Sequence, residues 1–87
     1  MGDIQIIDQR RNVRCMIEVK NYDSKSVPTK EVIKCERDVR QTKEISCCVM
    51  ISLGSPITGH AHEDIGWVTD VDGITKPILY LSSREEL

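Results

Sequence analysis

One stretch decides how the sheet of this chain is put together: Met16-Ile17-Glu18-Val19-Lys20-Asn21-Tyr22. Apolar side chains recur at every second position from Val13 to Val19, which is the period of a β-strand. Ile4 and Ile6 show the same period upstream, and the polar residues 8–12 between the two segments are typical of a turn. We therefore expect the two segments to pair as a β-hairpin.

The apolar residues also predict the register of this hairpin. A turn centred on residues 10–11 pairs Ile4 with Ile17 and Ile6 with Cys15. This register gathers the alternating apolar residues on one face, which we expect to be the buried face of a half-buried sheet.

The same register brings three charged side chains together. Asp3 lies opposite Glu18, and Lys20 follows on the same side because side chains alternate along a strand. Asp8 lies at the turn end, about 17 Å away at roughly 3.4 Å per residue, so we interpret it as a turn former. Two carboxylates and an amine are thus predicted to meet at one end of one face.

A helix and a buried strand are predicted next. Residues 29–43 contain few helix breakers and place Val32, either Cys35 or Glu36, and Val39 at helical spacing. Residues 46–53 form an apolar run rich in β-branched side chains, which is typical of a strand buried on both faces. A strand, a helix and a strand in this order predict a βαβ crossover, with the second strand parallel to residues 17–19.

The rest of the chain is predicted to add strands to the same sheet. We expect a short edge strand at residues 65–71, a turn at Asp72-Gly73 and a final strand at residues 77–81. Ser83 followed three residues later by Glu86 is the capping pattern of a helix start. The expected fold class is α/β, a mixed β-sheet flanked by helices.

Length and composition limit the possible classes. The 87 residues form a single small domain (residues 1–87), without Phe and with 39% hydrophobic residues, so its core is marginal. We therefore expect either a fragment of a longer protein, truncated at both ends, or a homo-oligomer. No apolar run is long enough to span a bilayer. The four cysteines are interpreted as buried free thiols, which favours an intracellular, reducing compartment such as the cytoplasm or nucleus.

Asp3, Glu18 and Lys20 are suited to the cleavage of a phosphodiester bond. Mg²⁺ prefers hard oxygen ligands, and the two carboxylates with the backbone carbonyl of Val19 supply them. A bound metal ion activates a water molecule for attack, and Lys20 can stabilise the negative charge that develops.

These residues carry a family resemblance. Asp3 and Glu18-Val19-Lys20, followed by a helix and a buried strand, resemble the PD-(D/E)XK nuclease superfamily, which has the restriction-endonuclease-like fold. The resemblance covers about residues 2–53, and Gly2 stands where the family name has proline. It implies a Mg²⁺- or Mn²⁺-dependent nuclease acting on DNA, with Asp3 and Glu18 as metal ligands and Lys20, Asp3 and Glu18 as the catalytic set. The family usually has a helix before its first motif strand, and this sequence begins after that point.

Cations cluster between Arg10 and Lys43, although the net charge is −2. Five of them lie on the predicted helix or in the segments beside it: Lys25, Lys30, Lys34, Arg37 and Lys43. Two interpretations carry equal weight: these cations contact the phosphate backbone of a nucleic acid, or they form a solvated face. Trp67 and Tyr80 are interpreted as packing residues.

Other functions remain as alternatives. His60 and His62 with the cysteines could indicate zinc, but their spacing favours solvated loop histidines. A Cys/His nucleophile pair is a weaker alternative still. The main rival is a catalytically incomplete nuclease-fold module that binds nucleic acid or a protein partner, and a second rival is a structural part of a larger assembly.

Overall fold

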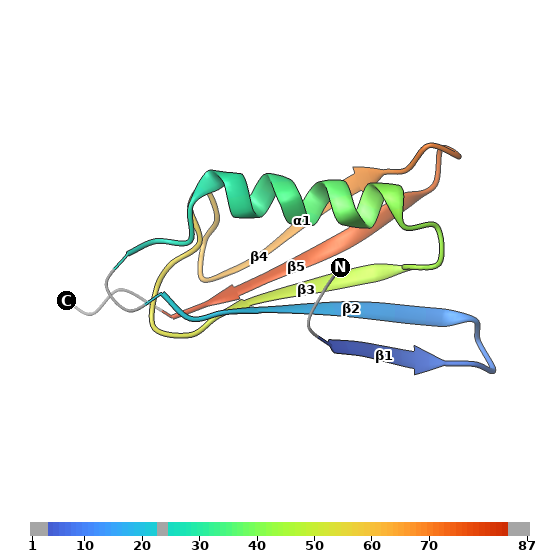
Figure 1. Cartoon of the computed structure of the whole chain (residues 1–87), viewed down its shortest axis with the longest axis horizontal. Helices are drawn as coiled ribbons and strands as arrows, with labels where there is room; N and C mark the ends of the chain where they lie inside the picture. The colour runs from blue at the N-terminus through green and yellow to red at the C-terminus, as the bar shows by residue number, and fades with distance from the viewer. Residues whose placement is uncertain (1–3, 23–24, 84–87) are drawn as a thin grey trace.

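The computed structural model of the chain describes residues 4–22 and 25–83, which form a five-stranded sheet and one helix. The elements are β1 (Ile4–Asp8), β2 (Val13–Lys20), α1 (Thr29–Gln41), β3 (Cys47–Ser52), β4 (Glu63–Thr69) and β5 (Thr75–Ser82). The strands lie in the order β1-β2-β3-β5-β4. β2, β3 and β5 run parallel, and the edge strands β1 and β4 run antiparallel to their neighbours (Figure 1). The predicted mixed α/β class is confirmed.

The N-terminal hairpin has the register that its apolar pattern predicts. Ile4 pairs with Ile17 and Ile6 pairs with Cys15. Asp8 is a turn former, as expected, because its Oδ1 accepts a hydrogen bond from the backbone N–H of Arg10 at 3.1 Å. The periodicity of two short segments was therefore enough to align them.

The βαβ arrangement is also confirmed. β3 pairs in parallel with β2, and α1 connects the two strands. The helix buries Val32, Cys35 and Val39, the three apolar residues at the predicted spacing. It begins after Pro28, whose lack of an N–H suits the first turn of a helix, where no backbone acceptor is available.

The prediction of which sheet face is buried was wrong. Within the described residues a single helix covers one face, and this is the face of Glu18 and Lys20 rather than that of Ile4 and Ile17 (Figure 1). The apolar stripe of α1 packs over an alternating set supplied by the neighbouring strands: Met16, Cys48, Met50, Ile78 and Tyr80. The pleat of a sheet is shared by its strands, so β3 and β5 determine which face of β2 lies beneath the helix.

Two further predictions were also wrong, because only one face of the sheet is covered by a helix within the described residues. β3 is buried on one side only, since Cys48, Met50 and Ser52 are buried while the residues between them are half-buried. The sheet is not flanked by helices on both sides within the described residues. The apolar face of the hairpin is therefore the open face of the sheet.

A buried connection fixes the start of α1 near the ends of the parallel strands. Val27 is fully buried, and its backbone bridges to Ile57 in the segment after β3. The N–H of Val27 donates to the carbonyl of Pro56 at 2.9 Å, and the N–H of Thr58 donates to the carbonyl of Val27 at 3.1 Å. These bonds hold the N-terminus of the helix at the carboxyl edge of β2 and β3.

The C-terminal half adds a hairpin to this core. β4 is an edge strand, as expected, but it begins at Glu63, and β5 lies inside the sheet between β3 and β4. The predicted helix start at residues 83–86 falls mostly outside the described residues. All four cysteines are free, with Cys35 and Cys48 buried and the other two half-buried. Among the described residues, no helix has the length and apolarity needed to cross a membrane.

Candidate functional site

Glu18 and Lys20 lie side by side on the helix-facing side of β2. They are two residues apart on one strand, so their side chains project from the same face. Lys20 Nζ lies 3.8 Å from Glu18 Oε2. The Glu18 side chain is 11% exposed and that of Lys20 is 20% exposed. The predicted Glu–Lys pairing is confirmed, and solvent reaches it.

A second carboxylate, which the sequence analysis missed, comes from the helix. Lys20 Nζ donates a hydrogen bond to Glu31 Oε2 at 3.3 Å. Glu31 lies in the first turn of α1, where a negative charge is favoured by the unpaired N–H groups of the helix. An acidic residue early in a helix that follows a parallel strand was the available signal, because such a helix begins near the carboxyl end of that strand.

The charges around Lys20 favour its protonated form. Burial alone would lower the pKa of Lys20, but the hydrogen bond to Glu31, the charges of Glu31 and Glu18, and Tyr22 outweigh it. The pKa of Lys20 is consequently raised above its ordinary value. One ammonium faces two carboxylates, so this cluster keeps an excess of negative charge.

Serine side chains extend the site across the carboxyl ends of the central strands. Lys20, Ser52 and Ser82 are register partners at the carboxyl ends of the three parallel strands. A cavity of about 220 Å³ lies at these strand ends and is lined by Ile51, Ser52, Leu81, Ser82 and Ser83. Ser52 Oγ donates a hydrogen bond to the backbone carbonyl of Ser55 at 2.6 Å. Ser82 Oγ is buried without a hydrogen-bond partner among the described residues.

The Glu18 and Glu31 carboxylates are oxygen donors of the kind that a hard cation takes, but Lys20 Nζ already lies 3.8 and 3.3 Å from them. Asp3, the other predicted ligand, lies outside the described residues. In the part of the chain that the structure describes, no three acidic, imidazole or thiol groups gather at one point. The role of the Val19 carbonyl stays a prediction.

The predicted phosphate-contacting cations are accessible. Lys25, Lys30, Lys34 and Arg37 are all exposed. Lys30, Lys34 and Arg37 are spaced i, i+4 and i+7, so they share one stripe of α1. Lys30 adjoins Glu31, and the stripe therefore runs from the edge of the site along the helix. Lys43 lies beyond the far end of the helix and pairs with Asp72 at 3.9 Å.

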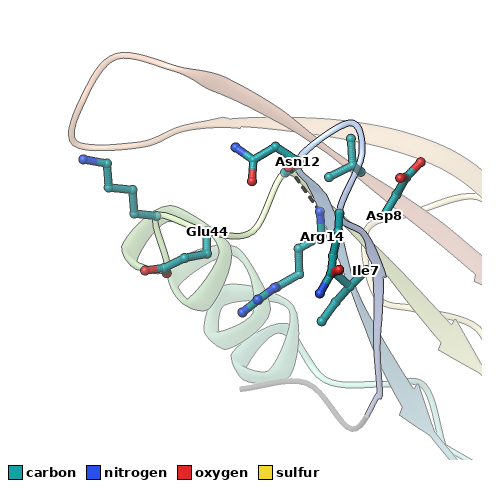
Figure 2. A pocket seen from close by; sticks show the side chains of 9 residues that line it. Ile7, Asp8, Asn12, Arg14 and Glu44 are labelled. Atoms are coloured by element: carbon teal, nitrogen blue, oxygen red, sulfur yellow. Dashed lines mark hydrogen bonds between the residues drawn. The ribbon is translucent and has the colours of Figure 1, made fainter.

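A larger pocket lies at the opposite end of the molecule. It measures about 550 Å³ and lies between the β1–β2 turn and the α1–β3 connection, lined by Ile7, Asp8, Gln9, Asn12, Val13, Arg14, Lys43, Glu44 and Ser46 (Figure 2). Its lining balances Asp8 and Glu44 against Arg14 and Lys43. Of the predicted catalytic and metal-binding residues that the structure describes, Glu18, Val19 and Lys20 all lie away from its lining.

His60 is not the solvated side chain that was expected. Its Nδ1 lies 2.8 Å from Asp64 Oδ2, and its ring stacks on Tyr80 with centroids 3.6 Å apart. The hydrogen bond to His60 lowers the pKa of Asp64. Tyr80 is buried, as predicted, whereas Trp67 is 61% exposed and packs against no core.

Comparison with known proteins finds no relative. Protein-family models, curated proteins and solved structures were all searched, and none of them matches this chain.

Proposed function

We propose that this chain is the core of a Mg²⁺- or Mn²⁺-dependent nuclease that hydrolyses phosphodiester bonds of DNA with water as the nucleophile. The observation that supports this function most directly is the position of Lys20 Nζ, 3.8 Å from Glu18 and 3.3 Å from Glu31. The cluster lies at the carboxyl ends of parallel strands, where open α/β sheets bind their ligands. The βαβ unit that carries it also agrees with a restriction-endonuclease-like core.

Glu18 and Asp3 are the proposed metal ligands, with the carbonyl of Val19 as a further one. The bound ion would supply an activated water and neutralise charge on the phosphate. Glu18 is suited to this role because its carboxylate is held at the sheet edge by β2 and lies close to the partly exposed Lys20. Glu31 adds a carboxylate from α1 and deepens the negative potential that attracts a cation.

Lys20 is the proposed catalytic residue. Its raised pKa keeps Nζ protonated at neutral pH, so it acts as a hydrogen-bond donor and a positive charge rather than as a base. Negative charge grows on the phosphoryl oxygens during attack, and a preorganised ammonium stabilises it. Glu31 positions this ammonium from the helix side through the 3.3 Å hydrogen bond.

The stripe of cations on α1 supports DNA as the substrate. Lys30, Lys34 and Arg37 span about 10 Å along the helix at roughly 1.5 Å per residue, and Lys25 lies just before it. Their exposed positive charges can contact successive phosphates as the strand leaves the site. Binding is then expected to weaken as salt rises, with a slope of about −0.7 to −0.9 per phosphate contact in log units.

The free thiols support a reducing intracellular compartment as the place of action. The Sγ atoms of Cys35 and Cys48 lie 3.4 Å apart without a bond between them. The hydrogen bond to Cys35 and burial raise the pKa of Cys48, which keeps it as the less reactive thiol.

Calorimetric titration with Mn²⁺ tests the proposed site. We expect the wild type to bind Mn²⁺ and Glu18→Gln to bind at least about tenfold more weakly, because one charged ligand is lost. Glu44→Gln is the matched control, since Glu44 is exposed in the connection between α1 and β3. Circular dichroism checks that each variant folds.

Plasmid nicking in Mn²⁺ then separates the nuclease from its main rival. Nicking by the wild type that falls by about a hundredfold in Lys20→Ala supports catalysis at this site. Mn²⁺ binding or DNA binding without any nicking identifies an incomplete nuclease-fold module. Equal Mn²⁺ affinity in the wild type and Glu18→Gln rejects this metal site altogether.

A further inference from the structure

No helix covers the face of the sheet opposite α1 within the described residues (Figure 1), and the strand registers place mainly apolar residues on it. One register row crosses all five strands and contains only aliphatic residues: Ile4, Ile17, Val49, Leu79 and Ile65. The neighbouring row on the Lys20 side contains Val19, Ile51 and Leu81 and ends at Glu63. On the other side, Ile6 pairs with Cys15, Cys15 with Cys47, and Trp67 with Pro77. We call this surface the open face.

The large side chains of the open face are exposed to solvent. Ile4 is 51% exposed, Ile65 is 52% exposed and Trp67 is 61% exposed. These three belong to the two edge strands; on the central strands Leu79 is 37% exposed, and Ile17 and Val49 are half-buried. Monomeric proteins rarely leave a contiguous apolar patch larger than a few hundred Å² in water, and larger ones mark interaction sites.

Charged side chains on the open face are confined to its ends. Asp8 ends β1 near the first turn, and Glu63 begins β4 at the opposite end of the sheet. On the three central strands, the residues that alternate onto this face carry no charge. A partner can therefore cover the centre without burying an unpaired charge.

The size of the open face reaches the smallest area of a specific interface, below the standard size of a stable one. Five strands about 4.8 Å apart give a width of roughly 24 Å, and strands of five to eight residues give a length of roughly 20 Å. Each copy would contribute on the order of 500 Å², so two copies bury on the order of 1,000 Å², the lower bound for a specific interface.

We propose that two copies of this chain pack their open faces together, sheet against sheet, about a two-fold axis. A second copy offers a face of equal area with the same uncharged centre. In such an isologous contact each row can meet apolar residues of the other copy. Two facing sheets pack about 10 Å apart, a distance that aliphatic side chains of this size fill. The dimer gives the open face a second packing layer, which the single helix on the other face does not supply.

This arrangement leaves the Glu18–Lys20–Glu31 cluster accessible. The cluster lies on the helix side of the sheet, so both copies present it on the outside of the dimer. The interface does not depend on the proposed nuclease activity, and it would exist equally in a binding module.

The mass of the chain in solution tests the interface. Sedimentation equilibrium should give about twice 9.9 kDa at high concentration and approach 9.9 kDa on dilution to the low micromolar range. Trp67 is the only tryptophan and lies on the open face, so its emission should shift to longer wavelength over the same dilution. A wild type that stays monomeric at every concentration overturns the proposal, and the open face then serves a different partner.

Charge substitutions locate the interface. Ile65→Lys buries an unpaired ammonium in the dimer and should weaken association by at least about a hundredfold. Ile6→Lys, on the opposite edge strand, should do the same, and it covers the case in which Ile65→Lys fails to fold. Ile33→Lys is the matched control, because Ile33 is 56% exposed on α1 against 52% for Ile65. A dimer that both sheet variants leave intact, or that Ile33→Lys alone disrupts, shows that the contact lies elsewhere.

Discussion

Two lysine–carboxylate clusters lie at opposite ends of α1, and they differ in how fully their charges are satisfied. At the C-terminal end, Lys76 Nζ lies 3.3 Å from Asp70 Oδ2 and donates to the carbonyls of Val39 and Thr42 at 3.4 and 3.1 Å. At the N-terminal end, Lys20 Nζ is shared between the carboxylates of Glu18 and Glu31. In the first cluster the side chains of Lys76 and Asp70 are 4% and 2% exposed, and in the second those of Lys20, Glu18 and Glu31 are 20%, 11% and 21% exposed.

The difference agrees with a structural role for the first cluster and with the proposed catalytic role of Lys20 in the second. The carboxylate of Asp70 also accepts backbone N–H groups of Asp72 and Ile74, both at 2.9 Å, so each charge of the first cluster has several partners. Lys76 further neutralises the partial negative charge at the helix C-terminus. The second cluster has one positive charge for two negative ones and retains attraction for another cation. A buried, satisfied lysine stabilises the fold, whereas an unbalanced and accessible one is available for chemistry.

Removal of Lys76 should have the largest effect on stability. Lys76→Met leaves Asp70 buried without its counter-ion and removes two hydrogen bonds to α1, so we expect a loss of about 3 kcal/mol in the free energy of unfolding. Urea denaturation followed by circular dichroism measures this loss. Lys43→Met is the control, because its pair with Asp72 is exposed and should contribute less than about 1 kcal/mol. Equal losses in the two variants would mean that the buried cluster has no special structural role.

Removal of Lys20 should affect cleavage more than folding. Lys20→Ala deletes the ammonium that faces the developing charge, and we expect the nicking rate in Mn²⁺ to fall by about a hundredfold. The same urea experiment should show a smaller loss of stability than Lys76→Met, because Lys20 is partly exposed. Arg11→Ala controls for the loss of an exposed surface cation, since the Arg11 side chain is 84% exposed. A variant that cleaves at the wild-type rate removes Lys20 from the mechanism.

Acid should weaken the first cluster. The backbone N–H of Ile74, the Lys76 ammonium and the N–H of Asp72 together lower the pKa of Asp70 below its ordinary value of 3.8, against the opposing effect of burial. A carboxylate with a lowered pKa contributes stability above its unfolded pKa and loses it as the pH falls through the folded one. Below about pH 4, the thermal midpoint of the wild type should therefore fall faster than that of Asp70→Asn, and the gap between them should narrow. Parallel curves would exclude this linkage.

The sequence predicts those parts of the fold that depend on local periodicity. The hairpin register, the parallel β2–β3 pair and the apolar stripe of α1 all follow from alternation or helical spacing within one or two segments. The sequence did not predict which face of β2 the helix covers, because that face depends on which alternate residues β3 and β5 contribute beneath the helix. Glu18 and Lys20 could be paired from their spacing, since residues two apart on a strand share a face.

Glu31 and Lys76 escaped sequence analysis for the same physical reason. Each is a charged residue whose contacts come from another segment of the chain, and local spacing does not show such contacts. Glu31 reaches Lys20 because the βαβ connection returns the helix to the end of β2. Lys76 is buried because β5 runs beneath the C-terminal end of α1.

Alkali should weaken the second cluster, with a smaller effect. Lys20 has a pKa raised above its ordinary value of 10.5, so the stability it contributes is complete below pH 10.5 and is lost as the pH rises through the folded pKa. Glu31→Gln removes the hydrogen-bonded carboxylate and should lower the pKa of Lys20, which an NMR titration of its side chain measures. Because the pair is partly exposed, the loss of stability should be no more than about 1 kcal/mol at neutral pH. Glu44→Gln should leave this titration unchanged. An unchanged pKa in Glu31→Gln would mean that Glu31 does not position Lys20, and the distinction between the two clusters would then rest on Glu18 alone.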